Sequence, residues 1–212
     1  MKKAAFYTLG CKVNQYETEA MAELFADSGY EIKEFTEVAD VYVINTCSVT
    51  NMGDRKSRQI IRRAKKLNPN AVIAVTGCYA QTAPDEVLAI EGVNLVLGTK
   101  DRKNIVTLVE ELNTESNINH VSDIMSNHEF EELQIKQYSN RTRAFIKIQE
   151  GCNQFCSYCI IPYARGPVRS RAKDDVVREI KELAHNGFKE IILVGIHVAS
   201  YGVDLGDTTL ES

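Results

Sequence analysis

Apolar positions along the first hundred residues follow two different periods. Short apolar runs typical of strands cover residues 4–9, 30–35, 41–46, 71–76 and 94–99, and the run at 30–35 alternates like an edge strand. Helical periodicity follows four of these runs, over residues 14–29, 52–67, 84–90 and 101–113. Strands that alternate with crossover helices predict an α/β fold with a parallel sheet covered on both faces.

The first predicted helix has a clear apolar face and two end signals. Its face carries Ala20 and Phe25 among other apolar residues, and Gly29 suits its C-terminal end. Asn14 followed by Glu17 matches a capping box, so we expect the helix to begin at Asn14.

The second half of the chain has a different organisation. Residues 114–140 are polar and acidic with little periodicity, which indicates a connection between domains with room for a short strand. A strand at 144–149, a helix at 173–187 and a strand at 190–195 then form one βαβ unit. We therefore predict an N-terminal domain over 1–113, a linker over 114–140 and the start of a second domain over 141–212. One βαβ unit is too small to be a domain, so we expect the second domain to be incomplete.

Composition narrows the class of protein. The chain has 212 residues, 44% of them hydrophobic, and a formal net charge of −4, which argues against a general nucleic-acid binder. No apolar run is long enough to span a membrane, and the short run after Met1 lacks a cleavage pattern. We expect a cytoplasmic protein, in which six cysteines favour metal or catalytic sites over disulfides.

Three of the cysteines stand at equivalent places in the predicted sheet. Cys11, Cys47 and Cys78 each follow the end of a predicted strand. The carboxyl ends of parallel strands share one edge of a sheet, so we expect these thiols to converge there. The alternative is that they are ordinary buried cysteines, a residue type that is often found in cores.

The other three cysteines lie in one loop after the strand at 144–149. Cys152, Cys156 and Cys159 have the spacing C-x3-C-x2-C. Thiolate sulfur suits zinc and iron–sulfur clusters. Three cysteines leave one iron of a [4Fe–4S] cluster open for a substrate or cofactor. A zinc ion would need a fourth ligand, and no further His or Cys lies between residues 153 and 171.

At this point the sequence resembles the radical S-adenosylmethionine (SAM) methylthiotransferase family. The resemblance covers the whole chain and rests on four stretches: TLGCKVNQYETEAM, NTCSVTNMGDRKSRQ, VTGCYAQ and GCNQFCSYCIIPYARGPVRSR. It is strongest to the branch that modifies C2 of N6-threonylcarbamoyladenosine at position 37 of tRNA. The resemblance implies a Rossmann- or flavodoxin-like methylthiotransferase domain, followed by the first βα units of a partial TIM barrel. Family members are longer, so the chain is expected to be truncated and inactive alone.

The resemblance also implies a role for each cysteine. Cys152, Cys156 and Cys159 would hold the [4Fe–4S] cluster that binds SAM and cleaves it to a 5′-deoxyadenosyl radical. Cys11, Cys47 and Cys78 would hold an auxiliary [4Fe–4S] cluster that presents sulfur. The radical would take hydrogen from C2 of the adenine, sulfur would replace it, and a second SAM would supply the methyl group.

Other candidate residues surround these cysteines. For SAM we expect contacts from Tyr158, Arg165 and Gly195, and we do not expect His197 to bind iron. Three asparagines flank the first two cysteines and suit either hydrogen bonds to the auxiliary site or helix capping: Asn14, Asn45 and Asn51. The helix at 52–67 presents basic residues that suit RNA phosphates or a solvated helix face: Arg55, Lys56, Arg58, Arg62 and Arg63.

The resemblance implies partners as well, and it leaves alternatives open. The partners would be tRNA and an electron donor of flavodoxin or ferredoxin type, with the sulfur donor unidentified and no membrane involved. Within the family, the target could instead be isopentenyladenosine in tRNA or a ribosomal protein. Outside it, the alternative is a non-catalytic zinc protein that binds RNA.

Overall fold

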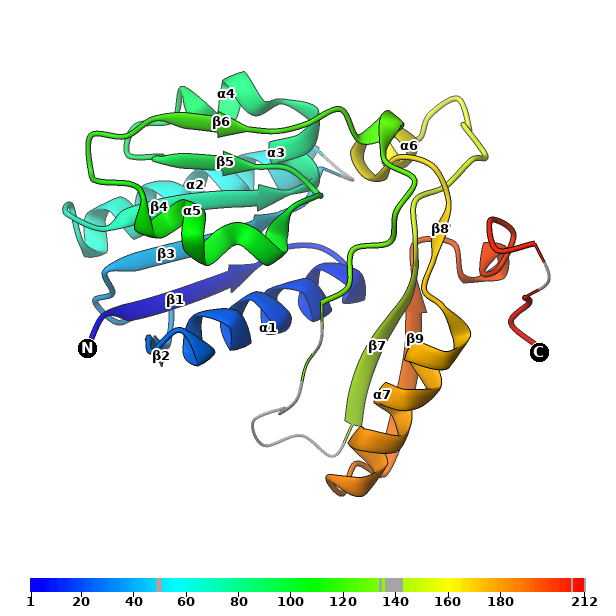
Figure 1. Cartoon of the computed structure of the whole chain (residues 1–212). Coiled ribbons are helices and arrows are strands. Elements are labelled where there is room, and N and C mark those ends of the chain that lie inside the picture. The colour runs from blue at the N-terminus through cyan, green and yellow to red at the C-terminus, as the bar shows by residue number, and fades with distance from the viewer. Residues whose placement is uncertain (49–50, 134, 136–142, 207, 212) are drawn as a thin grey trace.

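The computed structural model describes residues 1–48, 51–133, 135, 143–206 and 208–211, and it places them in two sheets (Figure 1). The first sheet is parallel and has the strand order β2-β1-β3-β4-β5-β6. Its strands are β1 (Lys3–Thr8), β2 (Glu31–Lys33), β3 (Val41–Thr46), β4 (Val72–Gly77), β5 (Leu95–Leu97) and β6 (Ile118–His120). In the second sheet, β7 (Arg143–Glu150) pairs in parallel with β9 (Glu190–Gly195) and antiparallel with β8 (Arg169–Ser170). The predicted α/β fold class is confirmed.

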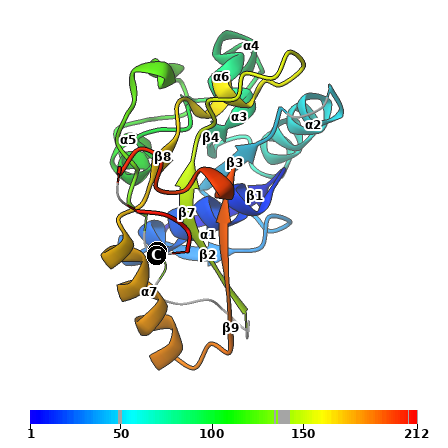
Figure 2. The same cartoon turned by 90° about the vertical axis from the view of Figure 1, so that its right-hand side faces the viewer.

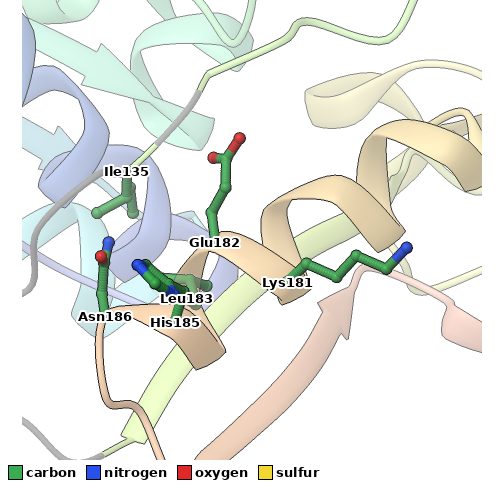
Figure 3. A pocket seen from close by; sticks show the side chains of 6 residues that line it. All are labelled: Ile135, Lys181, Glu182, Leu183, His185 and Asn186. Carbon is green, nitrogen blue, oxygen red and sulfur yellow. The ribbon is translucent and has the colours of Figure 1, made fainter.

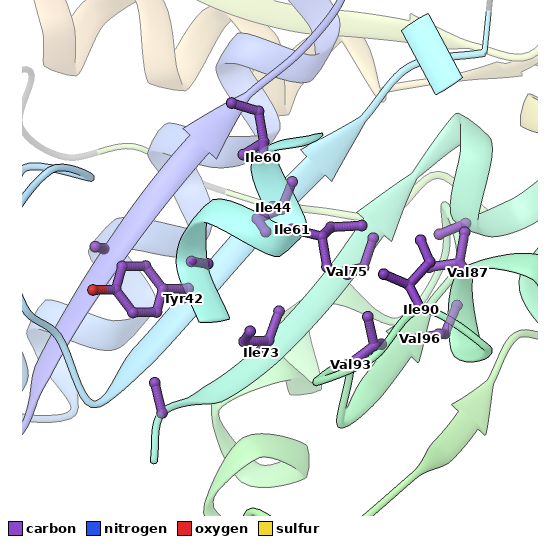
Figure 4. Packing of buried hydrophobic residues seen from close by; sticks show 14 of the residues in the cluster. Tyr42, Ile44, Ile60, Ile61, Ile73, Val75, Val87, Ile90, Val93 and Val96 are labelled. Carbon is purple, nitrogen blue, oxygen red and sulfur yellow. The ribbon is translucent and has the colours of Figure 1, made fainter. Parts of the chain in front are cut away.

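Helices cover both faces of the first sheet because its central strands are apolar on both sides. Every residue of β3 is buried. On one face, Ile60 and Ile61 pack with Ile44 and Val75 in a single apolar cluster (Figure 4). The first half contains α1 (Lys12–Asp27), α2 (Asn51–Leu67), α3 (Cys78–Thr82), α4 (Pro84–Leu88), η1 (Arg102–Asn104), α5 (Ile105–Glu110) and η2 (Ile124–Ser126). The second half contains α6 (Ile161–Arg165), α7 (Lys173–His185) and η3 (Val198–Ser200). Within the described residues, no helix has the length and apolar character needed to cross a membrane.

The first sheet extends into the predicted linker. Strand β6 pairs with β5 in the register Leu95↔Ile118, so residues as far as His120 belong to the sheet. The residues of β6 are exposed, so the sequence contains no apolar run that would predict this strand.

The prediction that the first helix begins at Asn14 with a capping box is wrong. Helix α1 begins at Lys12, with Cys11 as its N-cap residue. Asn14 and Glu17 lie inside the helix and are buried. Their side chains contact distant parts of the chain. Their spacing in the sequence is that of a capping box, but neither side chain caps the helix.

The two halves of the chain pack directly against each other. Val13 of α1 clusters with Phe145 of β7 and Val194 of β9. The Thr99 hydroxyl donates to the carbonyl of Ala164 in α6 at 2.7 Å. Figure 2 shows α6 beside α3, above β7 and β9, in agreement with the contacts between these two helices. The carboxyl ends of both sets of strands therefore lie near the junction between the halves.

Candidate metal centre

Cys11, Cys47 and Cys78 lie at one edge of the first sheet. They follow β1, β3 and β4, which are neighbours in the sheet. The register pairs Thr8 with Asn45 and Thr46 with Gly77, so the three strands end at nearly the same level. All three cysteines are free thiols, with Cys11 exposed, Cys47 half-buried and Cys78 buried. We call this set the sheet-edge triad.

Two glycines allow the chain to pass closely at this edge. Gly10 has φ +105°, and a Cβ placed on it would lie 2.9 Å from Cβ of Cys47. Gly77 has φ +96°, and its Cβ would lie 2.4 Å from the backbone oxygen of Thr46. Glycine alone adopts such backbone angles at little cost and leaves room for these contacts. Gly10 and Gly77 therefore fix the course of the backbone directly before Cys11 and Cys78.

Asn14 connects the polar groups around the sheet-edge triad. Its Nδ2 donates to the carbonyls of Leu9 at 2.7 Å and Thr46 at 2.9 Å. Its Oδ1 accepts from Sγ of Cys11 at 3.5 Å and from a guanidinium nitrogen of Arg165 at 2.5 Å. Asn14 therefore lies where sequence analysis placed it, as a hydrogen-bonding neighbour of the first cysteine.

Asn45 supports this arrangement from the neighbouring strand. Its Nδ2 donates to the backbone oxygen of Asn14 at 3.0 Å and to the Thr18 hydroxyl at 3.2 Å. It thus fixes helix α1 rather than a sulfur atom. The expectation for Asn51 concerns a side chain outside the described residues.

An open pocket of about 520 Å³ lies beside the exposed member of the triad. It is lined by Thr8, Gly10, Cys11, Lys12, Gln15 and Glu19. This pocket gives Cys11 free space on its solvent side, where an additional group can be accommodated.

Another pocket, of about 440 Å³, lies away from the cysteines. Figure 3 shows Ile135 facing the end of α7, with Lys181 directed away from it. It is lined by Ile135, Lys181, Glu182, Leu183, His185 and Asn186. Since this pocket contains no thiol, we do not assign it to the metal centre.

Arg165 occupies a position that sequence analysis did not anticipate. Its side chain is fully buried, and its Nε donates to Sγ of Cys78 at 3.3 Å. One terminal nitrogen donates to Glu17 at 2.5 Å and to Glu150 at 2.7 Å. The guanidinium expected to contact SAM is therefore surrounded by groups of the protein itself.

Arg165 belongs to a larger set of buried charges between the two halves, which we call the junction cluster. It contains four cations and three carboxylates: Arg102, Lys147, Arg165, Arg169, Glu17, Glu131 and Glu150. Arg102 lies 2.6 Å from Glu17 and 2.9 Å from Glu131. Lys147 lies 3.1 Å from Glu150. The cluster carries one more positive than negative charge.

The junction cluster favours the ionised forms of Glu17 and Glu150. Burial by itself raises the pKa of Glu17, but the charges of Arg102, Arg165 and Lys147 outweigh it, so the pKa lies below its usual value. The same balance holds the pKa of Glu150 well below its usual range. For Cys78 burial prevails over the opposing charge of Arg165, and it raises the pKa of the free thiol. A metal would compete with the proton for this sulfur.

The second set of cysteines, the loop triad, lies between β7 and α6. Cys156 is exposed, whereas Cys152 and Cys159 are half-buried. The Cys152 amide donates to the carbonyl of Gly166 at 3.0 Å, and the Cys159 amide donates to that of Cys156 at 2.9 Å. A Cβ on Gly151 would lie 1.8 Å from the Pro167 oxygen, so a close backbone contact also precedes this triad.

The remaining candidates for SAM contact lie around this loop. Tyr158 is 91% exposed, so its ring is free to receive a ligand. Gly195 ends β9, and a Cβ placed there would lie 2.9 Å from Oε1 of Gln149. That same Gln149 oxygen accepts from the His197 amide at 2.7 Å. Gly195 therefore allows the end of β9 to lie close against β7.

The basic residues of α2 divide into two kinds. Arg55, Lys56, Arg62 and Arg63 are exposed. Arg58 instead donates to the Tyr79 hydroxyl at 2.9 Å and is less available to a ligand. Helix α2 begins four residues after Cys47, so its first turns lie at the same end of β3 as the sheet-edge triad.

The two triads offer sulfur donors alone. In the described part of the chain, no three His, Cys, Asp or Glu side chains are placed to hold one metal ion. Each triad offers soft thiol donors with one exposed member, next to a tight glycine turn. Such sulfur-only sets suit clusters in which protein sulfurs bind different irons.

Comparisons with known proteins match each half of the chain to a family model. Residues 3–98 match the model of "Uncharacterized protein family UPF0004", and residues 146–209 match that of the Radical SAM superfamily. The first match lies on the N-terminal α/β sheet, and the second covers most of the part that carries the loop triad. The chain is similar over nearly its whole length to members of the radical SAM methylthiotransferase family.

Individual relatives cover nearly the whole chain. The threonylcarbamoyladenosine tRNA methylthiotransferase MtaB of Bacillus subtilis (strain 168) is 54% identical over 208 residues, which are 98% of this chain and 46% of the relative. The protein of the same name from Aquifex aeolicus (strain VF5) is 44% identical, over 96% of this chain and 50% of the relative. A tRNA-2-methylthio-N(6)-dimethylallyladenosine synthase of Dictyoglomus thermophilum is 36% identical, over 99% and 48%. The chain thus spans about half the length of the curated relatives that it matches.

Proposed function

We propose that this protein acts in the methylthiolation of tRNA, adding sulfur and a methyl group at C2 of N6-threonylcarbamoyladenosine at position 37. The observation that carries the proposal is the presence of two separate thiol triads, one in each half of the chain, each following the carboxyl ends of strands in a parallel pairing, with a buried charge cluster between the halves. The names of the relatives from Bacillus subtilis and Aquifex aeolicus support this target.

The triads supply the ligands for two [4Fe–4S] clusters in this proposal. Cys152, Cys156 and Cys159 hold one cluster and leave an iron open for SAM, whereas the sheet-edge triad holds the other. When bound, the clusters and SAM would supply the radical, the sulfur and the methyl group, with the electron coming from an external donor. The protein contributes the placement of the two sites and a junction that excludes water between them.

Residues around the loop triad position SAM. The exposed ring of Tyr158 stacks on its adenine, and the backbone at Gly195 contacts its amino group. Arg165 was the third candidate, but its hydrogen bonds to Glu17, Glu150 and Cys78 favour a role on the side of the sheet-edge triad.

The exposed basic residues of α2 contact the RNA backbone. Arg55, Lys56, Arg62 and Arg63 provide charges for phosphates on the helix that follows Cys47. Arg58 contributes less because it is engaged with Tyr79. A flavodoxin or ferredoxin delivers the electron, and the reaction takes place in the cytoplasm.

Two measurements test the proposal. Anaerobic purification followed by iron and sulfide analysis should give a brown protein with several irons per chain, whereas stoichiometric zinc in a colourless protein would favour the zinc alternative. Mass spectrometry of tRNA nucleosides should show that deletion of the gene removes 2-methylthio-N6-threonylcarbamoyladenosine and that re-expression restores it. Loss of the methylthio group from isopentenyladenosine instead would assign the second target, which the 36% identical relative represents.

A further inference from the structure

Arg165 connects the two triads physically. It ends α6, six residues after Cys159 of the loop triad, and its Nε–H points to Sγ of Cys78 in the sheet-edge triad at 3.3 Å. These two partners lie 87 residues apart in sequence and in different halves of the chain. One side chain thus joins the segment of one metal site to a sulfur of the other.

The guanidinium is held in this orientation from several sides. Glu17 of α1 and Glu150 of β7 accept from one terminal nitrogen, and Asn14 accepts from the other at 2.5 Å. With both terminal nitrogens engaged, Nε has a fixed direction toward the sulfur. A planar group with several donors can satisfy all these partners at once, which a lysine ammonium cannot do in the same geometry.

The buried charges of the junction cluster are not fully balanced within the cluster. The junction cluster contains four cations and three carboxylates, and all four cationic side chains are at most 1% exposed. Buried charges are stable only when they are paired. An iron–sulfur cluster bound through three thiolates would place negative charge beside the Arg165 guanidinium.

We propose that Arg165 is a positioning residue that raises the reduction potential of the iron–sulfur group held by Cys11, Cys47 and Cys78, an inference that rests on the proposed function. Hydrogen bonds to cluster sulfurs and positive charge nearby both favour the reduced, more negative state. The Arg165 guanidinium supplies both. Because Arg165 ends the helix that follows the loop triad, its contacts couple the position of the SAM site to that of the sulfur-bearing site.

The test uses the protein with the loop triad changed to Ala, so that iron reports the sheet-edge triad alone. Potentiometric titration followed by electron paramagnetic resonance gives its midpoint potential. Arg165→Met should lower that potential while iron per chain stays unchanged. Arg165→Lys keeps the charge but loses the fixed Nε–H, so its midpoint potential should lie between those of the parent and Arg165→Met. This variant replaces Arg165→Met in the test if the latter does not fold.

Arg102→Met is the matched control. Arg102 is equally buried and pairs with the same Glu17 and Glu150, but the described contacts give it no hydrogen bond to Cys78. It should lower the potential by less than Arg165→Met. Equal shifts in the two variants, or an unchanged potential in both Arg165 variants with full iron, would overturn the inference. Absence of iron from the parent with an intact sheet-edge triad would instead overturn the proposed function.

Discussion

Lys147 on β7 donates from Nζ to Oε1 of Glu17 on α1 at 3.2 Å, across 130 positions of sequence. Both side chains are fully buried. Glu17 also forms ion pairs with Arg102 and Arg165, so one carboxylate is paired with three cations from outside its own helix. The junction between the two halves is therefore a charged core, in which the loss of one partner leaves others unpaired in a medium that solvates them poorly.

Glu17→Gln should destabilise the chain strongly. Removing one member of a buried ion pair typically costs about 3–5 kcal/mol, because the opposite charge stays buried without compensation. Urea unfolding at neutral pH measures this change. The control is Glu190→Gln, which removes an ion pair to Arg143 whose side chains are about half exposed. That change should cost less than about 1 kcal/mol, and equal losses in the two variants would contradict this account.

The junction cluster also predicts the response to acid. The pKa of Glu150 is well below its ordinary value of 4.5, because nearby cations outweigh the effect of burial. Below pH 4.5 the unfolded chain binds a proton that the folded chain still excludes, so stability falls as pH falls toward the folded pKa. The stability advantage of the parent over Glu150→Gln should therefore be full at neutral pH and shrink below pH 4.5. Urea unfolding across this pH range measures it.

Glu179→Gln serves as the control for this experiment, because the stability difference between the parent and this variant should change with pH in the opposite direction. Burial raises the pKa of Glu179 above its ordinary value of 4.5, despite the opposing charge of Arg171. As pH rises above 4.5, the folded chain binds the proton more tightly than the unfolded chain, so the parent loses stability relative to the variant. Parallel slopes for the two substitutions would contradict the assignment of the two environments.

Local pattern was sufficient to predict most of the first sheet. Strand β3 was predicted with its observed bounds, since an unbroken apolar run indicates a strand buried on both faces. Strand β6 has exposed residues and only three positions, so its place in the sheet depends on pairing with β5. Helices α3 and α6 have five residues each and were missed, whereas α4, of the same length, was predicted over residues 84–90.

The candidate site shows where local pattern misleads. Asn14 and Glu17 have capping-box spacing, yet their partners are Leu9, Thr46 and Arg165. Arg165 was predicted near SAM because it follows the loop triad in sequence. Its contact with Cys78 requires knowledge of how the halves pack, which no single segment contains. The signal available in the sequence was Glu150, which is the only acidic residue among the basic residues of 141–171.

Gly77 should be intolerant of substitution for two separable reasons. It has φ +96°, and a Cβ there would meet the backbone oxygen of Thr46 at 2.4 Å. Gly77→Ala should therefore destabilise the protein by more than the roughly 1–3 kcal/mol that backbone strain alone costs. It should also lower the iron bound by the sheet-edge triad, because Cys78 must move. Urea unfolding and iron analysis measure the two effects.

Gly29→Ala isolates the strain from the clash. Gly29 has φ +85°, but a Cβ on it would meet nothing within 4 Å. This variant should lose only the strain contribution and keep its full iron content. If Gly29→Ala and Gly77→Ala lose the same stability and the same iron, the close contact at Thr46 has no role.

Binding of RNA through α2 should appear in the salt dependence. The combined change Arg62→Gln and Arg63→Gln should weaken binding of an anticodon stem-loop that carries N6-threonylcarbamoyladenosine. It should reduce the slope of log affinity against log salt by about 2, since each phosphate contact contributes about 0.9. Fluorescence anisotropy at several salt concentrations measures the slope. The control Lys181→Gln removes an exposed charge from α7 and should leave the slope unchanged.

The two triads should be separable by mutation because they depend on different parts of the fold. The loop triad comes from one segment between β7 and α6, whereas the sheet-edge triad requires β1, β3 and β4 to be in place. Changing Cys152, Cys156 and Cys159 to Ala should leave the first sheet folded and remove about half of the iron. It should abolish reductive cleavage of SAM. Changing the sheet-edge triad to Ala should also halve the iron, yet spare SAM cleavage and stop sulfur insertion. Circular dichroism, iron analysis and detection of 5′-deoxyadenosine distinguish these outcomes. Full iron in either triple variant, or loss of SAM cleavage in the second variant while its loop cluster is intact, would show that the triads are not independent sites.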